Sequence, residues 1–237
     1  GHTERGIGFE VFMHGICSAL EKAQSELGIS SNLIMCFLRH LDQASAFDTL
    51  QAAGPYLDMI TGVGLDSSEL GHPPALFQQV FASAAEEGLK RVAHAGEEGP
   101  PEYVYEALDL LQVDRIDHGN RSLEDQDLVQ RLVDERMPLT VCPLSNLRLA
   151  VVRDMSEHPL RKMLALGLNA CINSDDPAYF GGYMNENFNT LIDASGLTRD
   201  EIFQLTINGF ESSFLTRDKK QAHLEQIQAI RKLGNGA

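Results

Sequence analysis

The chain has 237 residues, of which 43% are hydrophobic, and its 34 acidic and 19 basic residues give a formal net charge of −15. This length suits one large α/β domain with a sizeable core. The excess of acid argues against nucleic acid and anionic membrane surfaces as partners, because both are bound mainly through Lys and Arg. A small neutral substrate remains compatible with such a charge.

The cysteines indicate a reducing compartment. None of Cys17, Cys36, Cys142 and Cys171 belongs to a C-x-x-C pair, and three lie inside apolar runs. We therefore expect buried thiols rather than disulfides. The sequence has neither an apolar run of about 18 residues nor the pattern of a secretory leader. Together these features predict a cytoplasmic protein.

Short apolar runs alternate with helical patterns along the chain. We predict strands at residues 32–38, 59–65, 90–94, 115–118, 139–142 and 168–173. Apolar spacing predicts helices at residues 11–27, 44–53, 123–136, 185–195, 198–208 and 218–233, and two more that begin at the Pro73-Pro74 and Pro100-Pro101 pairs. Ser122 is expected to cap the helix at 123–136. Strands that are each followed by a helix favour a parallel sheet.

The even βα repeat favours a (β/α)₈ TIM-type barrel over a doubly wound sheet. Such a barrel needs eight strands, and the chain offers six after an initial helix. We therefore expect an α/β barrel that, as given, lacks its first one or two βα units. No linker interrupts the pattern, which predicts that residues 1–237 form a single domain.

Titratable side chains follow three of the predicted strands. His94-Ala-Gly-Glu97 ends the third, Asp117-His118-Gly119 the fourth and Asp175-Asp176 the sixth, while Asp66 and Ser145 follow two others. Each group alone has an ordinary structural explanation, such as a turn, a surface histidine or a helix cap. In a parallel α/β protein, however, these strand ends meet at one mouth. Imidazoles and carboxylates gathered there are the groups that a metal-assisted hydrolase needs.

Four motifs in order carry a family resemblance. They are His94-Ala-Gly-Glu97, Arg115-Ile-Asp-His118-Gly119, Cys142-Pro-Leu-Ser145-Asn146 and Asn173-Ser-Asp175-Asp176-Pro177. They resemble the adenosine/adenine deaminase family of metal-dependent hydrolases, and the resemblance runs from about Thr3 to Phe214. Residues 64–74 and 174–183 are similar to the adenine deaminase branch of that family.

The resemblance implies a zinc ion at the barrel mouth and hydrolytic deamination of adenine to hypoxanthine and ammonia. His94 and Asp175 would be zinc ligands. Glu97 would protonate N1 of the purine as water adds at C6, and His118 would orient the attacking hydroxide. Asp176 would accept or share a hydrogen bond at purine N7.

One family feature is absent from the sequence. The family takes two further zinc ligands from an H-x-H at the end of the first strand, and this chain contains no H-x-H. A catalytic zinc normally has at least three protein ligands. We therefore expect these 237 residues to be the C-terminal portion of a longer enzyme, and alone to bind zinc poorly and lack deaminase activity. The H-x-E and P-C-x-x-C pair of the other zinc deaminases is also absent.

Two other functions remain open. Adenosine deaminase or a related purine deaminase is the nearest alternative, and a Tyr179-Phe180 loop that fills the ribose space would instead favour the free base. A non-catalytic barrel that binds a purine or a protein is the other. The missing ligands favour it, whereas Glu97 and His118 disfavour it, because a binding module needs no general acid. Nitrogen and oxygen ligands also suit iron or manganese, and the oligomeric state, including a homo-oligomer, stays open.

Overall fold

The computed structural model describes residues 1–233 and divides the chain into two compact units. The first unit comprises Gly1–Ala93 and Glu106–Val113, and the second comprises His94–Tyr105 and the chain from Asp114 onward. Each unit is described by itself below. The prediction of a single domain over residues 1–237 stays a prediction.

The first unit contains a parallel sheet. Strands β1 (Ile34–Leu38) and β2 (Gly62–Asp66) pair from Ile34↔Gly62 to Leu38↔Asp66, and β2 pairs with β3 (Lys90–Ala95). The interior is apolar, with Phe37, Val63 and Leu65 almost fully buried. Burial on both faces is typical of strands in parallel sheets, which helices cover on either side. The last two residues of β3, His94 and Ala95, belong to the second unit.

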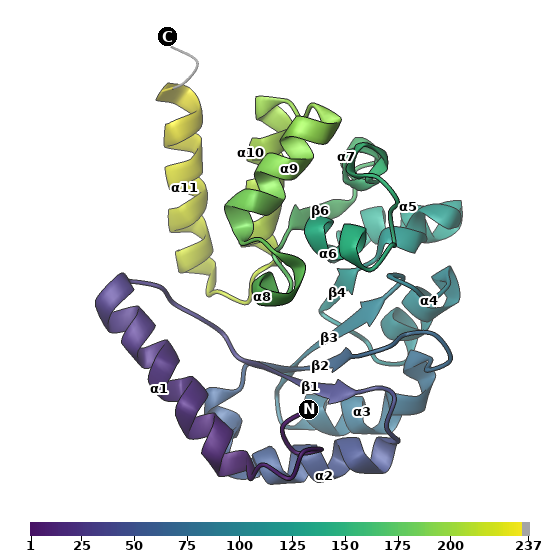
Figure 1. Ribbon diagram of the computed structural model, residues 1–237, viewed down its shortest axis with the longest axis vertical. Coiled ribbons are helices and arrows are strands. Elements are labelled where there is room, and N and C mark those ends of the chain that lie inside the picture. Colours follow the sequence, from purple (N-terminus) through teal and green to yellow (C-terminus); the bar gives the residue numbers. More distant parts are fainter. Residues whose placement is uncertain (234–237) are drawn as a thin grey trace. The chain divides into compact units, whose positions relative to one another are not determined.

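The second unit continues the same pattern. Strands β4 (Arg115–His118), β5 (Pro138–Val141) and β6 (Asn169–Ile172) are parallel and pair in chain order (Figure 1). Helix α10 packs on β6, where the buried Asn208 side chain donates to the Ala170 carbonyl oxygen at 2.8 Å. The carboxyl ends of these strands therefore share one edge.

A helix follows each of the six strands, as predicted (Figure 1). The α-helices are α1 (Phe9–Leu27), α2 (Gln43–Ala53), α3 (Gln78–Glu86), α4 (Pro101–Asp109), α5 (Gln126–Asp134), α6 (Pro143–Arg148), α7 (Leu160–Ala165), α8 (Pro177–Phe180), α9 (Met184–Ser195), α10 (Arg199–Ser212) and α11 (Arg217–Leu233). Short 3₁₀ helices cover Gly54–Met59, Pro74–Phe77, Asn120–Glu124 and Met155–Glu157.

The predicted boundaries are wrong at several places. Helix α5 begins at Gln126 rather than residue 123, because the Asp125 side chain accepts from the backbone N–H groups of Asp127 and Leu128. Ser122 is instead buried in a 3₁₀ turn, where its hydroxyl donates to the Gly119 carbonyl oxygen. Residue 59 ends a 3₁₀ helix rather than opening β2, and no residue ranges were predicted for the short helices α6, α7 and α8.

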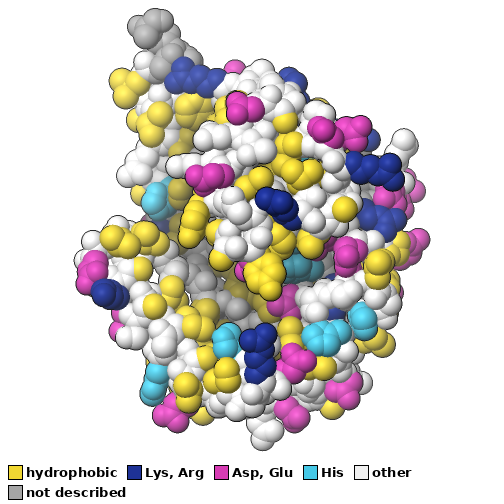
Figure 2. Space-filling view, in the orientation of Figure 1, with side chains coloured by type: hydrophobic (Ala, Val, Ile, Leu, Met, Phe, Trp, Pro, Cys, Tyr) yellow, Lys and Arg dark blue, Asp and Glu magenta, His cyan; other side chains and the backbone are white. Residues whose placement is uncertain are grey.

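All four cysteines are free, as expected, but only two of them are buried. Cys142 and Cys171 are buried, whereas Cys17 and Cys36 are half-buried. Figure 2 shows acidic and basic side chains dispersed over the visible face, with no single basic patch on that face. Within residues 1–233, no helix is both long and apolar enough to cross a bilayer.

A tight turn after β3 sets the direction of the chain toward Glu97. Gly96 has φ +71°, and a Cβ placed on it would lie 2.8 Å from Val104 Cγ2. Its carbonyl oxygen accepts from the Arg121 N–H at 2.8 Å, which ties this turn to the segment after β4. Both the left-handed backbone and the close approach require glycine at this position.

Replacing Gly96 by alanine tests this requirement. Any alanine at positive φ costs about 1–2 kcal/mol, and crowding against Val104 adds roughly 1–3 kcal/mol. Gly196 is the matched control, because its φ is +64° but an added Cβ would meet nothing within 4 Å. We expect Gly96→Ala to lower the free energy of unfolding in urea more than Gly196→Ala. Equal losses would show that the close approach is unimportant.

Candidate active site

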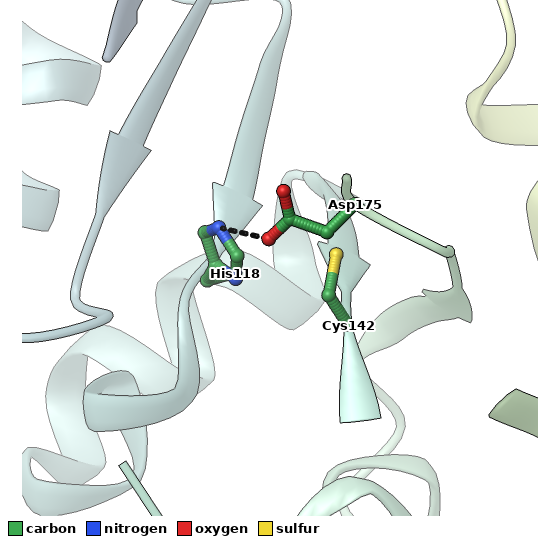
Figure 3. A group of neighbouring side chains, drawn as sticks. All are labelled: His118, Cys142 and Asp175. Atoms are coloured by element: carbon green, nitrogen blue, oxygen red, sulfur yellow. Dashed lines mark ion pairs between the residues drawn. The ribbon is translucent and has the colours of Figure 1, made fainter. Parts of the chain in front are cut away.

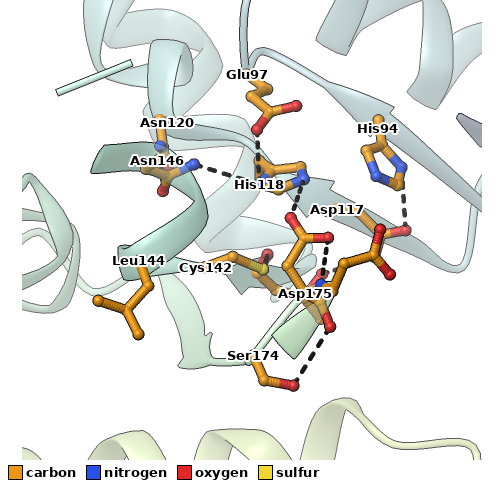
Figure 4. Close-up of polar contacts among 12 residues, drawn as sticks. His94, Glu97, Asp117, His118, Asn120, Cys142, Leu144, Asn146, Ser174 and Asp175 are labelled. Carbon is orange, nitrogen blue, oxygen red and sulfur yellow. Dashed lines mark hydrogen bonds and ion pairs between the residues drawn. The ribbon is translucent and has the colours of Figure 1, made fainter. Parts of the chain in front are cut away.

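Four of the five predicted site residues form one cluster in the second unit (Figure 4). His118, the last residue of β4, lies at its centre. Its Nδ1 is 3.5 Å from Glu97 Oε1, and its Nε2 is 3.9 Å from Asp175 Oδ2. The rings of His94 and His118 lie 4.8 Å apart, centroid to centroid. The ends of β3, β4 and β6 thus bring together an acid, two imidazoles and a second carboxylate.

Unusual backbone conformations position two of these side chains. His118 has φ +69° and Asp175 has φ +55°, so both are non-glycine residues in the left-handed region. This region costs an L-residue about 1–2 kcal/mol. Residues held there against that cost cluster at active sites and ligand clamps. The strain therefore supports a functional role for this strand edge.

The His118 ring is neutral at neutral pH. The residue is only 1% exposed, and burial lowers its pKa to about 3, with the nearby His94 as a second cause. A neutral imidazole has one protonated and one unprotonated nitrogen. His118 can therefore both donate and accept a hydrogen bond, and its neighbours decide which nitrogen does which.

The Asp117 carboxylate lies beside His94. Asp117 Oδ2 lies 3.6 Å from His94 Nδ1, while Oδ1 accepts from the Thr140 hydroxyl at 2.6 Å and from Arg115 Nε at 3.3 Å. Burial by itself would raise the pKa of Asp117, but His94, Arg115 and the Thr140 hydrogen bond together lower it. Asp117 is therefore ionised, and its Oδ2 lies beside His94 Nδ1 at a distance beyond that of a hydrogen bond.

His94 and Asp175 carry atoms of the kinds that hold a divalent metal ion. A metal-binding histidine usually has its other ring nitrogen next to a carboxylate or carbonyl group, and Asp117 lies 3.6 Å from His94 Nδ1. That contact leaves His94 Nε2 as the nitrogen for a metal. Asp175 Oδ1 accepts from the Asp176 N–H at 2.9 Å, while Oδ2 faces His118. One imidazole nitrogen and one carboxylate oxygen are ordinary zinc ligands.

Cys142 is a second candidate ligand, which the sequence analysis did not single out. Figure 3 shows it beside His118 and Asp175, and the ligand atoms of the three residues lie within 4.8 Å of one another. A thiol must lose its proton to bind a metal. Burial, followed by the charges of Asp175, Asp117 and Glu97, raises the pKa of Cys142 well above its usual value. In the metal-free chain the Cys142 thiol is therefore neutral.

Two other residues from the sequence analysis have different surroundings. Asp176 is exposed and stands at the N-cap position of α8 without a side-chain capping hydrogen bond, and its backbone N–H donates to Asp175 Oδ1. Its role at purine N7 stays a prediction. Ser145 lies fully buried in the first turn of α6.

A group of buried polar residues next to His118 was not predicted from the sequence. Asn146 Nδ2 is 3.4 Å from His118 Nδ1, and Asn146 Oδ1 accepts from Asn120 Nδ2 at 2.8 Å and from His158 Nε2 at 3.3 Å. Asn146 and Asp117 each lie within one of the four family motifs, so the sequence offered a reason to consider both residues. His158 follows no strand and has no motif, and only the folded chain reveals it.

Curated relatives match nearly the whole chain. An adenine deaminase from Acinetobacter baylyi is 58% identical over 229 residues, which cover 97% of this chain and 69% of that protein. An adenine deaminase from Sphingopyxis alaskensis is 60% identical over 229 residues, covering 97% of this chain and 67% of that protein. The chain thus spans about two thirds of the length of these relatives.

Solved structures confirm the expected fold class, a partial (β/α) barrel. The crystal structure of adenine deaminase from Arthrobacter aurescens superposes with a TM-score of 0.95 at 48% identity, covering 98% of this chain and 71% of that chain. An amidohydrolase from Burkhoderia ambifaria with bound Zn gives a TM-score of 0.84 at 28% identity, covering 92% of this chain and 63% of that chain.

Family membership follows from a match over almost the full length. The sequence model of the family described as adenosine deaminase covers residues 1–230. That range includes all four strand-end motifs and the cluster around His118. The chain belongs to the adenosine deaminase family.

Proposed function

We propose that this protein carries out the hydrolytic deamination of adenine to hypoxanthine and ammonia, with zinc as its cofactor. The observation that carries the proposal is the placement of Glu97 and Asp175 on opposite nitrogens of His118, at 3.5 and 3.9 Å. Relatives named adenine deaminase at 58% and 60% identity support adenine as the substrate. The purine is then the small-molecule partner.

His94 and Asp175 are the residues that would hold the zinc. Support comes from the Asp117 carboxylate beside His94 Nδ1, and from the related amidohydrolase whose structure carries bound Zn. Zinc supplies Lewis acidity, which makes water a nucleophile at neutral pH.

Side chains of this protein position the water and the purine and supply the proton. His118 orients the attacking water toward C6 of the purine, and Glu97, which is 8% exposed, donates a proton to N1. Asp176 accepts or shares a hydrogen bond at N7. Addition of water and loss of the 6-amino group as ammonia leave a carbonyl at C6, which is hypoxanthine. Glu97 is well placed for this role because it touches the same imidazole that orients the water.

The finer expectations about the molecule stay predictions. These are the cytoplasmic location, a homo-oligomer, and the absence of nucleic-acid and membrane partners. We further propose that the 237 residues alone bind zinc weakly and do not turn over adenine. A catalytic zinc needs at least three protein ligands, and His94 and Asp175 are only two.

A chimera tests the activity. The segment of the Acinetobacter baylyi adenine deaminase that this chain matches, 69% of that protein, is replaced by this chain. We expect the chimera with zinc to release ammonia from adenine faster than from adenosine, and the 237 residues alone to release none. A folded, zinc-loaded chimera that is inactive on both, or that prefers adenosine, would contradict the proposal.

Replacing Glu97 tests its role as the acid. In the chimera, Glu97→Gln removes the acidic proton but keeps the side-chain shape, so we expect kcat to fall by about 10²- to 10⁴-fold, the usual contribution of a placed acid. Glu98→Gln is the matched control and should leave kcat unchanged. Activity of the Glu97 variant within tenfold of the parent chimera would remove Glu97 from this role.

Replacing Asp117 tests its contribution to metal affinity. Loss of a carboxylate that orients a metal-binding histidine typically costs about 10- to 100-fold in affinity. We expect Asp117→Asn to weaken zinc binding by the chimera by that factor, measured by competition with a chelator. Asp134→Asn, on the exposed side of α5, serves as the control. Unchanged affinity in the Asp117 variant would show that His94 is not oriented through Asp117.

A further inference from the structure

A line of buried polar side chains in the second unit ends on His118. His158 is 5% exposed, Asn146 0% and His118 1%. The three come from separate places: His158 lies between the 3₁₀ helix Met155–Glu157 and α7, Asn146 lies in α6, and His118 ends β4. Figure 4 shows Asn146 pointing at the His118 ring, with Asn120 behind it.

The direction of the hydrogen bonds is set at the His158 end. The backbone N–H of Leu160 donates to His158 Nδ1 at 3.2 Å. A ring nitrogen that accepts carries no proton, so the proton of His158 is on Nε2. This N–H points at Asn146 from 3.3 Å, and its partner there must be the carbonyl oxygen Oδ1. Asn120 Nδ2 donates to the same oxygen at 2.8 Å, and two donors together fix which way the amide points.

The orientation of the Asn146 amide then determines the tautomer of His118. With Oδ1 turned toward His158, the amino group of Asn146 faces His118 Nδ1 at 3.4 Å. An amino donor requires an unprotonated nitrogen, so the ring proton of His118 lies on Nε2, which faces Asp175 Oδ2 at 3.9 Å. Glu97 Oε1 lies 3.5 Å from the same Nδ1 atom, beside the Asn146 amino group.

We propose that Asn146 and His158 are positioning residues that hold His118 in its Nε2–H tautomer. His118 therefore offers a hydrogen-bond donor, not a metal-binding lone pair, at the nitrogen nearest Asp175. This assignment separates His118 from the metal ligands and lets it hold the attacking water through an N–H group. The consequence for catalysis rests on the proposed deaminase function, whereas the tautomer itself does not.

The tautomer is measured directly on the 237-residue chain. Long-range ¹H–¹⁵N correlation spectra of the ¹⁵N-labelled, chelator-treated protein at neutral pH distinguish the two ring nitrogens of each histidine, and His118→Gln identifies the His118 signals by their loss. We expect His118 and His158 both to show a protonated Nε2 and an unprotonated Nδ1. A protonated Nδ1 at His118 would overturn the proposal. Because no turnover is measured, this result is independent of the adenine assay.

Two variants of His158 separate positioning from simple capping of α7. His158→Asn keeps an acceptor near the place of Nδ1 for the Leu160 N–H but lacks the donor to Asn146, and His158→Gln does the reverse. We expect His158→Asn to lose the single His118 tautomer and His158→Gln to keep it. The opposite pattern, or no effect of either variant on His118, would show that His158 only caps the helix.

A variant of Asn146 keeps the test decisive if His158→Asn does not fold. Asn146→Asp retains the acceptor for His158 and Asn120 but replaces the amino donor by a carboxylate oxygen. We expect the His118 proton to move to Nδ1, which can then donate to that oxygen. An unchanged Nε2–H pattern in a folded Asn146→Asp protein would contradict the proposal.

Discussion

The candidate site depends on one buried imidazole. His118 is almost completely enclosed, and it meets Glu97, Asp175, Asn146 and the His94 ring at once. Burial disfavours the charged form of this ring and His94 adds to the effect, and together they outweigh the Asp117 charge and lower the pKa of His118 to about 3. The left-handed backbone at His118 turns the ring toward the mouth at the point where β4 ends. Moving this ring would separate the acid from the proposed metal ligands.

The three carboxyl groups of the site have different neighbours. Asp117 is buried among a histidine, an arginine and a hydroxyl, and stays ionised because these groups outweigh its burial. Glu97 instead lies against Nδ1 of the His118 imidazole, at 3.5 Å. Asp175 keeps one oxygen on the Asp176 N–H and turns the other inward. Neighbouring carboxylates with such different partners can serve as an orienting anion, an acid and a ligand.

Much of the site could be predicted from the sequence because parallel strands place their ends at one edge. His94, Glu97, His118 and Asp175 each follow a short apolar run, and the structure brings these four together. The limits have physical causes. Helix α6 is only six residues long, too short for an apolar period, and α5 begins at Gln126 because the Asp125 carboxylate before it accepts from two backbone N–H groups. His158 reaches the site through packing of a segment between two short helices, which no local pattern reveals.

Anomalous scattering at the zinc edge, from crystals of the zinc-loaded chimera, tests the central claim most directly. We expect one ion bonded to His94 Nε2 and an oxygen of Asp175, at about 2.0–2.2 Å, with His118 nearby but not bonded to it. An ion bonded to His118 and Cys142 instead would contradict the assignment of both the ligands and the orienting imidazole.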